Sequence, residues 1–185
     1  MGRLLNSEEF WSLFTEINYS AFRLELQPLY REDEEEESLR KFLAGEPTDP
    51  AVDVEGCLPW WELVRDLTRR GGRMERVRVH EDPPTDYQRW ERWLGRWNEE
   101  AGEVIWYPTR AQAHEFGLLP AAGDVDWWLF DSHRLVQMHF DADGNRIRTE
   151  LVSDPEAVVQ ANVWRDLALY HARRLAAAEP VKGGT

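Results

Sequence analysis

The pattern of apolar and polar positions predicts helices and strands that alternate over most of the chain. Apolar residues at helical spacing predict helices that begin near Ser7, Ser38, Pro59, Pro83 and Thr109. Alternating apolar and polar residues predict strands over residues 21–29, 73–80, 103–107, 125–131, 134–140 and 146–151. A last helix should follow an Asp154 cap, with a buried side made of Val158, Val159, Val163, Leu167 and Tyr170.

This order of elements predicts an α/β fold, with α+β as the alternative, in which helices flank a mixed central sheet. We expect residues 1–50 to form an N-terminal arm of helix, strand and acidic helix, because Pro47, Asp49 and Pro50 mark an irregular stretch. Residues 51–178 would form the main α/β domain and residues 179–185 a disordered tail. A length of 185 residues fits one compact unit.

The strand expected over residues 73–80 has an unusual pattern. Val77 and Val79 lie on one face, and Arg76, Arg78 and His80 lie on the other. A strand buried on both faces is normally almost entirely apolar. Either this strand lies at an edge of the sheet, or its arginine face lines a cleft.

Charge and composition narrow the class of partner. The net charge of −13 opposes direct binding of nucleic acid, whose phosphates need clustered Lys and Arg. Six consecutive acidic residues, from Glu32 to Glu37, are most simply a solvated loop and helix start. The functional alternative is a surface for a basic protein partner, formed by Glu34, Glu35, Glu36 and Glu37.

No catalytic or metal-binding constellation is recognisable, so the chain is not expected to be an enzyme, and no cofactor is predicted. Cys57 is the single cysteine, which excludes an internal disulfide and a Cys-rich zinc site and suits a reducing cytosol. The turn Asp141 to Asn145 lacks the glycine and glutamate positions of a calcium loop. No membrane span or signal peptide is visible, and we expect a cytoplasmic protein.

Arginine and tryptophan together suggest a small-molecule site. The chain has ten Trp and only two Lys, so nearly all its positive charge is Arg, which stacks on aromatic rings. A cleft of this composition would suit an anionic or aromatic ligand. The simpler interpretation is that the Trp residues are core and the Arg residues form surface ion pairs. The ligand-binding candidates are Arg76, Arg78, Tyr87, Trp106, Arg110, Trp128 and Asp131.

Several segments resemble an actinobacterial family of unknown function, the one numbered 6879. They are Ser20 to Glu25, Tyr30, Ser38 to Gly45, Arg76 to Val79, Asp86-Tyr87, Arg89 to Glu91, Glu100 to Glu103, Trp128 to Asp131, Phe140-Asp141 and Gly144. The likeness spans roughly Phe10 to Ala172 and brings no established activity. Members are often encoded beside helix-turn-helix regulators, which implies a regulatory setting.

The order of elements also resembles half of a phospholipase D-like domain. That superfamily carries a His-x-Lys signature, and none of the five histidines here is followed by Lys two residues on. The resemblance therefore implies a fold without the catalytic site. Our first hypothesis is a non-catalytic regulatory or protein-interaction module that works with a helix-turn-helix regulator. The alternatives are a small-molecule sensor with an Arg/Trp-lined pocket and a hydrolase with an unrecognised site.

Overall fold

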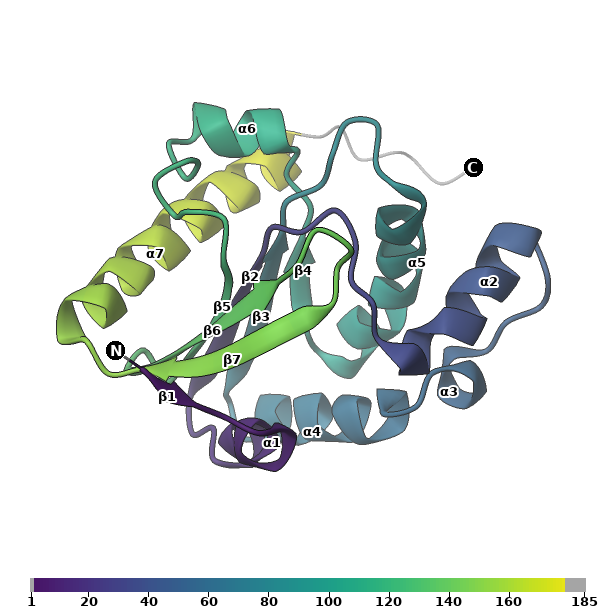
Figure 1. Ribbon diagram of the computed structural model, residues 1–185, viewed down its shortest axis with the longest axis horizontal. Helices are drawn as coiled ribbons and strands as arrows, with labels where there is room; N and C mark the ends of the chain where they lie inside the picture. Colours follow the sequence, from purple (N-terminus) through teal and green to yellow (C-terminus); the bar gives the residue numbers. More distant parts are fainter. Residues whose placement is uncertain (1, 179–185) are drawn as a thin grey trace.

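Seven strands form one mixed sheet in the computed structural model, which describes residues 2–178 (Figure 1). The strand order is β1-β7-β6-β5-β2-β3-β4, in which β2, β3 and β4 run parallel and the other pairs are antiparallel. The fold is therefore mixed α/β, as expected. The strands are β1 Arg3–Leu4, β2 Ser20–Glu25, β3 Arg73–Arg78, β4 Val104–Trp106, β5 Asp126–Phe130, β6 Arg134–Phe140 and β7 Arg146–Val152.

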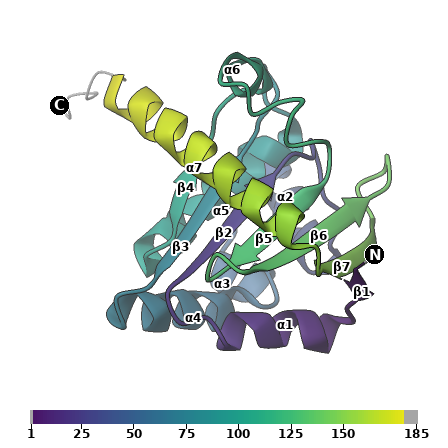
Figure 2. The same ribbon diagram turned by 90° about the vertical axis from the view of Figure 1, so that its left-hand side faces the viewer.

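Helices cover both faces of the sheet. Helices α1, α4 and α5 pack on one face, α2 and α3 pack beside them, and α6 and α7 cover the other face. Figure 2 shows α7 running diagonally across its face of the sheet. None of the described helices is long and apolar enough to cross a membrane. The helices are α1 Ser7–Thr15, α2 Glu36–Ala44, α3 Pro50–Asp53, α4 Cys57–Arg69, α5 Asp86–Ala101, α6 Arg110–Glu115 and α7 Pro155–Ala178.

Local capping sets where the helices begin. Thr109 caps α6 as expected, because its side chain accepts from the N–H of Gln112. The sequence of Ser7 followed by two glutamates predicts a cap at Ser7 for the first helix, but the cap lies one residue earlier. Asn6, not Ser7, accepts from the N–H of Glu9, and the Glu9 carboxylate returns a bond to the N–H of Asn6. The reciprocal pair satisfies two helix-end donors, which a cap at Ser7 would not do.

The N-terminal segment is built into the sheet. Strand β2 lies between β5 and β3, so the segment expected to form an arm supplies a central strand of the sheet, and its β1 adds an edge strand. The stretch that contains Pro50 is a short helix, α3, which packs on α2 and α4. The tail expected over residues 179–185 lies outside the described residues.

The buried side of α7 was predicted in part, because Val158 and Leu167 pack against the apolar cluster on the sheet as expected. Val159, Val163 and Tyr170 are 64%, 54% and 55% exposed. Larger side chains such as Trp164 also pack there, but the most deeply buried positions of α7 are mainly alanines, which let the helix backbone approach the sheet closely. The buried residues of α7 are Ala161, Ala168, Leu169 and Ala172.

Candidate ligand-binding site

The register of three strands places two charged strand faces side by side. In the sheet, Arg23 of β2 lies next to Arg76 of β3 on one side and Trp128 of β5 on the other. Glu25 lies next to Arg78 in the same register. Because side chains alternate along a strand, all of these face α4 and α5, while the valines of β3 face α6 and α7. The arginine face of β3 therefore points into the protein.

Glu25 is the common partner of three arginines. Its carboxylate accepts from Nε of Arg78 and from Nη1 of Arg76 at 3.3 Å, and Nη1 of Arg23 lies 2.9 Å away. Burial acts to raise the pKa of Glu25, but Arg23, Arg78 and Arg76 outweigh it and hold the pKa at about 2. Glu25 is therefore ionised at every physiological pH.

Three further buried carboxylates complete the network, and one of them, Asp126, lies 3.9 Å from Nη2 of Arg23. Glu103 accepts from Nε of Arg76 at 2.6 Å and from the indole N–H of Trp60 at 3.2 Å. Glu91 lies 3.4 Å from Nε of Arg78. All three carboxylates, with Glu25, are at most 3% exposed. Each arginine is thus held from more than one side, which fixes its orientation before any ligand arrives.

Aromatic rings flank two of these guanidinium groups. The Arg23 guanidinium lies 5.5 Å from the ring centroids of Tyr30 and Trp128, and that of Arg76 lies 5.4 Å from Trp128 and 5.5 Å from Trp60. Nε of Arg23 is buried and has no hydrogen-bond partner among residues 2–178. A buried N–H without an acceptor is costly, so the hydrogen-bonding capacity of Arg23 is not fully satisfied by the protein.

A cavity of 470 Å³ opens over the arginines and tryptophans. Its size suits a small molecule. The start of α4 also lies in its wall; the N-cap, Gly56, has no side chain to accept from the first N–H groups of the helix, and the positive end of the helix dipole lies there. The wall includes Phe10, Trp11, Phe14, Arg23, Glu32, Glu35, Glu55, Cys57, Trp60, Arg76, Arg78, Leu94, Asn98, Trp128, Met138 and Arg146.

Cys57 lines this cavity as a neutral thiol. Burial, with a contribution from Glu35, raises its pKa to about 12. The thiolate is the nucleophilic form of cysteine, so a thiol that stays protonated at pH 7 is poorly suited to covalent catalysis. Among residues 2–178 no three His, Cys, Asp or Glu side chains are grouped so as to hold a metal ion.

Glu35 is the titratable acid of the cavity wall. Burial raises its pKa to about 7, although its carboxylate accepts a hydrogen bond of 2.7 Å from the Tyr87 hydroxyl. The hydrogen bond from Tyr87 and the positive charge of Arg78 both lower the pKa of Glu35, whereas the carboxylates of Glu32 and Glu91 raise it further. The charge of the cavity wall therefore changes near neutral pH.

We expect Glu35→Gln to be more stable than the wild-type protein at pH 8 and equally stable near pH 4.5. The folded pKa of about 7 lies above the 4.5 of an ordinary glutamate, so ionisation opposes folding, and stability is lost as the pH rises through 7. Gln keeps the acceptor for Tyr87 without the charge; the gain should be on the order of 1 kcal/mol. Urea denaturation at both pH values measures it, and equal midpoints at pH 8 would contradict the raised pKa.

Three of the seven predicted ligand-binding residues meet at the cavity. Arg76, Arg78 and Trp128 all line its wall. Tyr87 lies behind that wall, where it binds Glu35 and packs edge-on against Tyr30. The cleft interpretation of the β3 pattern is the correct one, because β3 lies between β2 and β4 and not at an edge.

The other three predicted residues lie elsewhere. Trp106 is packed into the apolar cluster on the opposite face of the sheet. Arg110 binds the Glu81 carboxylate at 2.8 Å and the Leu26 carbonyl at 2.6 Å. Asp131 accepts from three consecutive backbone N–H groups, those of residues 18–20, at 2.7–3.0 Å. These contacts place Asp131 as a cap for the start of β2.

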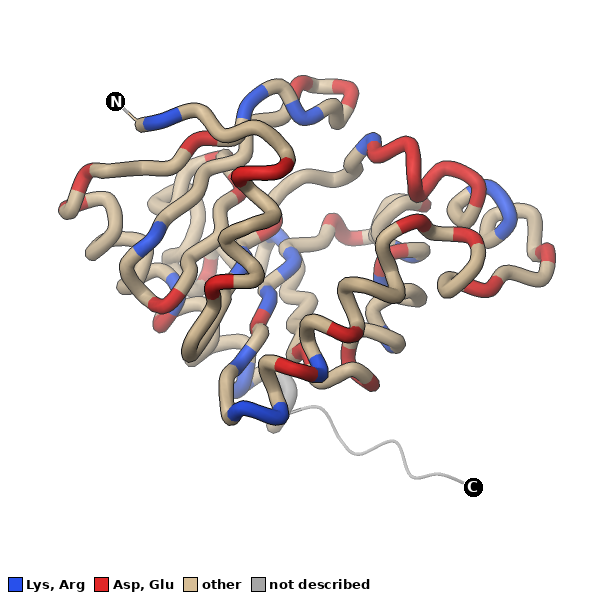
Figure 3. The backbone as a smooth tube through the Cα atoms, turned by 90° about the horizontal axis from the view of Figure 1, so that it is seen from below, with Lys and Arg blue, Asp and Glu red and all other residues tan. Residues whose placement is uncertain are grey.

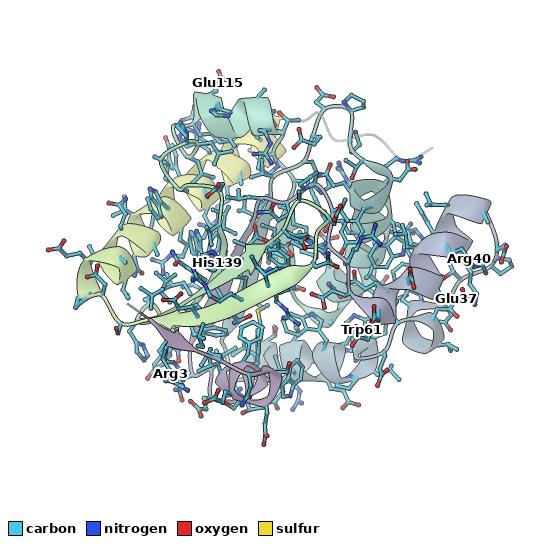
Figure 4. All side chains as sticks on the ribbon, in the orientation of Figure 1. Arg3, Glu37, Arg40, Trp61, Glu115 and His139 are labelled. Atoms are coloured by element: carbon cyan, nitrogen blue, oxygen red, sulfur yellow. The ribbon has the colours of Figure 1, made fainter. Side chains whose placement is uncertain are left out.

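The side chains of the acidic run, residues 32–37, differ in exposure: Glu35 faces the cavity, whereas several others face solvent. Glu34, Glu36 and Glu37 are exposed at the start of α2, whereas Glu35 is half-buried. Figure 3 shows the run as an unbroken red stretch, and in Figure 4 Glu37 and Arg40 point outward from α2. The exposed glutamates remain the predicted surface for a basic partner; Glu35 belongs to the cavity.

Arg23, Glu25 and Trp60 were missed from the sequence. The pattern that could have revealed the first two is the polar face of the strand over residues 21–29, which resembles that of β3. Two charged strand faces become a buried network only if the strands are neighbours. The pairing of β2 with β3 brings Glu25 and Arg78 together, although they are 53 positions apart in the sequence.

One family model matches the chain over residues 8–177, with the description Domain of unknown function (DUF6879). The chain belongs to this family. No curated protein matches it. In this DUF6879 domain, every residue of the buried ion network lies within the matched range. The actinobacterial origin and the likeness to a phospholipase D-like half domain remain predictions from the sequence.

Proposed function

We propose that this protein is a non-catalytic sensor that binds a small planar aromatic carboxylate in the cavity between α1, α4 and the sheet. The observation that carries the proposal is the buried Nε of Arg23, an unpartnered donor beside Trp128 in the cavity wall. Arginine recognises carboxylates through paired N–H donors, and the indole rings offer apolar faces.

The unpartnered N–H of Arg23 favours an acceptor over a cation. Net charge does not decide the preference, because buried carboxylates already pair with Arg23, Arg76 and Arg78. Among the acids that line the wall, Glu35 loses its charge below a pH of about 7. The positive end of α4 adds to the attraction for an anion. Because carboxylates already hold the buried guanidinium groups, little side-chain entropy is lost when a ligand binds.

The test is titration of the protein with 2-naphthoate at pH 6, followed by quenching of tryptophan fluorescence. We expect a dissociation constant on the order of 0.1–1 mM for a probe of this size. The cation 2-naphthylmethylamine has the same ring system and should bind at least ~10-fold more weakly, because it offers no acceptor to Arg23. Equal affinity for the two probes, or no binding of 2-naphthoate, refutes the proposal.

Arg146 and Arg148 supply a matched pair of variants on β7. Arg146 lines the cavity and is only 3.6 Å from Glu32 at the surface, so Arg146→Gln should fold and weaken 2-naphthoate binding about 3- to 10-fold. Arg148 lies outside that cavity wall, and Arg148→Gln should leave the affinity unchanged. Equal losses in the two variants would place the probe elsewhere.

An interaction with a helix-turn-helix regulator remains a prediction from the sequence. The exposed Glu34, Glu36 and Glu37 support it as a second candidate function, because they present negative charge to a basic surface. Glu34 lies in the turn before α2 and the other two at the start of α2, outside the cavity wall, so a partner could contact them while the cavity is occupied.

A further inference from the structure

A second cavity lies on the opposite face of the sheet, between α7 and the first residues of β2 and β3. It has a volume of 550 Å³ and is separated from the first site by the sheet itself. Its floor is formed by β2, and α7 forms one wall along residues 165–177. We call it the α7 groove. Its lining includes Ser20, Phe22, Arg73, Glu75, Ser132, Arg165, Asp166, Leu169, Tyr170, Arg173 and Arg174.

Positive charge is concentrated in the α7 groove, although the whole chain carries −13. Two of its four arginines are neutralised: Arg165 lies 2.8 Å from Asp166, and Arg173 lies 2.8 Å from Glu75. The other two are exposed, and within residues 2–178 neither has a carboxylate within 4.0 Å. These two are Arg73 and Arg174, which leave the groove with an excess of two positive charges.

An aromatic ring lies in the same groove. Tyr170 is 55% exposed, which is unusual for a large ring on a helix that packs on a sheet. The Arg174 guanidinium lies 5.5 Å from the Tyr170 ring centroid and donates to its hydroxyl at 2.9 Å. Ring and cation together make a platform on which a flat heterocycle can stack.

We infer that the α7 groove binds a nucleoside monophosphate, with its base on Tyr170 and its phosphate on Arg73 and Arg174. Guanidinium groups bind phosphate through two parallel N–H bonds, and every nucleobase has a face for stacking. The volume of the groove fits a ligand of this size. The negative charge of the chain opposes long-range attraction, so recognition depends on these local contacts.

Calorimetric titration with adenosine 5′-monophosphate tests this inference. We expect a dissociation constant on the order of 0.1–1 mM in low salt. Adenosine and inorganic phosphate should each bind at least ~10-fold more weakly, because each has only half of the contacts. Phosphate that binds as tightly as the nucleotide would overturn the role of Tyr170, and with it the nucleotide assignment.

Variants of exposed residues locate the bound nucleotide without threatening the fold. Arg73→Gln and Arg174→Gln should each weaken binding about 5- to 10-fold, whereas Arg69→Gln, an exposed change on α4 outside the groove, should have no effect. Tyr170→Ser should weaken binding of the nucleotide but not of phosphate. Equal affinities in Arg73→Gln and Arg69→Gln would overturn the inference. None of these variants should change the affinity for 2-naphthoate, so the proposal for the α7 groove and the proposal for the first cavity can be refuted independently.

Discussion

Replacing Glu25 by glutamine is expected to lower the free energy of unfolding by about 3–5 kcal/mol. The Glu25 carboxylate is 3% exposed and contacts the guanidinium groups of Arg23, Arg76 and Arg78. Glutamine preserves the size of the side chain but removes its charge, so three inward-facing cations lose their common partner. Urea denaturation at pH 7, followed by tryptophan fluorescence, measures the change.

The matched control for this change is Glu37→Gln. Glu37 also pairs with an arginine, Arg40 at 2.9 Å, but both side chains are about half exposed on α2. Exposed ion pairs contribute little, so the urea midpoint should not move measurably. Wild-type stability at pH 7 in Glu25→Gln would contradict the proposed role of the buried network.

The effect of Glu25 should also depend on pH. The folded pKa of about 2 lies below the 4.5 of an ordinary glutamate, so ionisation of Glu25 favours folding. Its contribution is complete above pH 4.5 and is lost as the pH falls towards 2. The difference between the wild-type protein and Glu25→Gln should shrink over that interval.

Asp131→Ala should lower the free energy of unfolding by about 2–4 kcal/mol, the second-largest effect. The carboxylate accepts from the backbone N–H groups of Asn18, Tyr19 and Ser20, and these bonds act against burial to lower the pKa of Asp131. Loss of the acceptor leaves up to three donors unpaired. Asp131 also has a φ of 47°, a left-handed conformation that alanine adopts less readily than aspartate or asparagine.

Asparagine at this position keeps both the acceptor and the backbone conformation. Asp131→Asn keeps an acceptor oxygen and tolerates the left-handed backbone, so its loss of stability should be clearly smaller than that of Asp131→Ala. Asp143→Ala, in the exposed β6–β7 turn, is the control for aspartate removal. Because Asp131 caps β2, its variants should bind 2-naphthoate with unchanged affinity once folded; a specific loss of binding would return Asp131 to the ligand site.

Element type could be predicted from the sequence because it depends on local patterns. Alternation along residues 73–80 and 125–131 located two central strands, and the Thr109 and Asp154 signals located the starts of α6 and α7. The buried face of α7 was predicted only in part, because Val158 and Leu167 pack on the sheet whereas Val159 is exposed. Valine and alanine stripes both lie at helical spacing, and the choice between them depends on how closely the helix approaches the sheet.

The candidate site was predicted only in part. The Arg76 and Arg78 face required a cleft or an edge, and that alternative came from the sequence of β3 alone. The residues that this face contacts could not be predicted from the sequence of β3. The acid that neutralises these arginines lies on β2, and an indole that flanks Arg76 lies on α4.

The amino-acid sequence by itself determined the helices and strands other than β1 and α3, the absence of disulfide chemistry within the chain and an arginine face on β3 that had to be explained. The tertiary structure showed what that face contacts. Parallel pairing of β2 with β3, and antiparallel pairing of β2 with β5, set Arg23 between Arg76 and Trp128. Strand order depends on contacts between distant parts of the chain, which local periodicity does not contain. For the same reason, the acidity of the chain indicated a type of partner, whereas the two cavities appeared only in the folded protein.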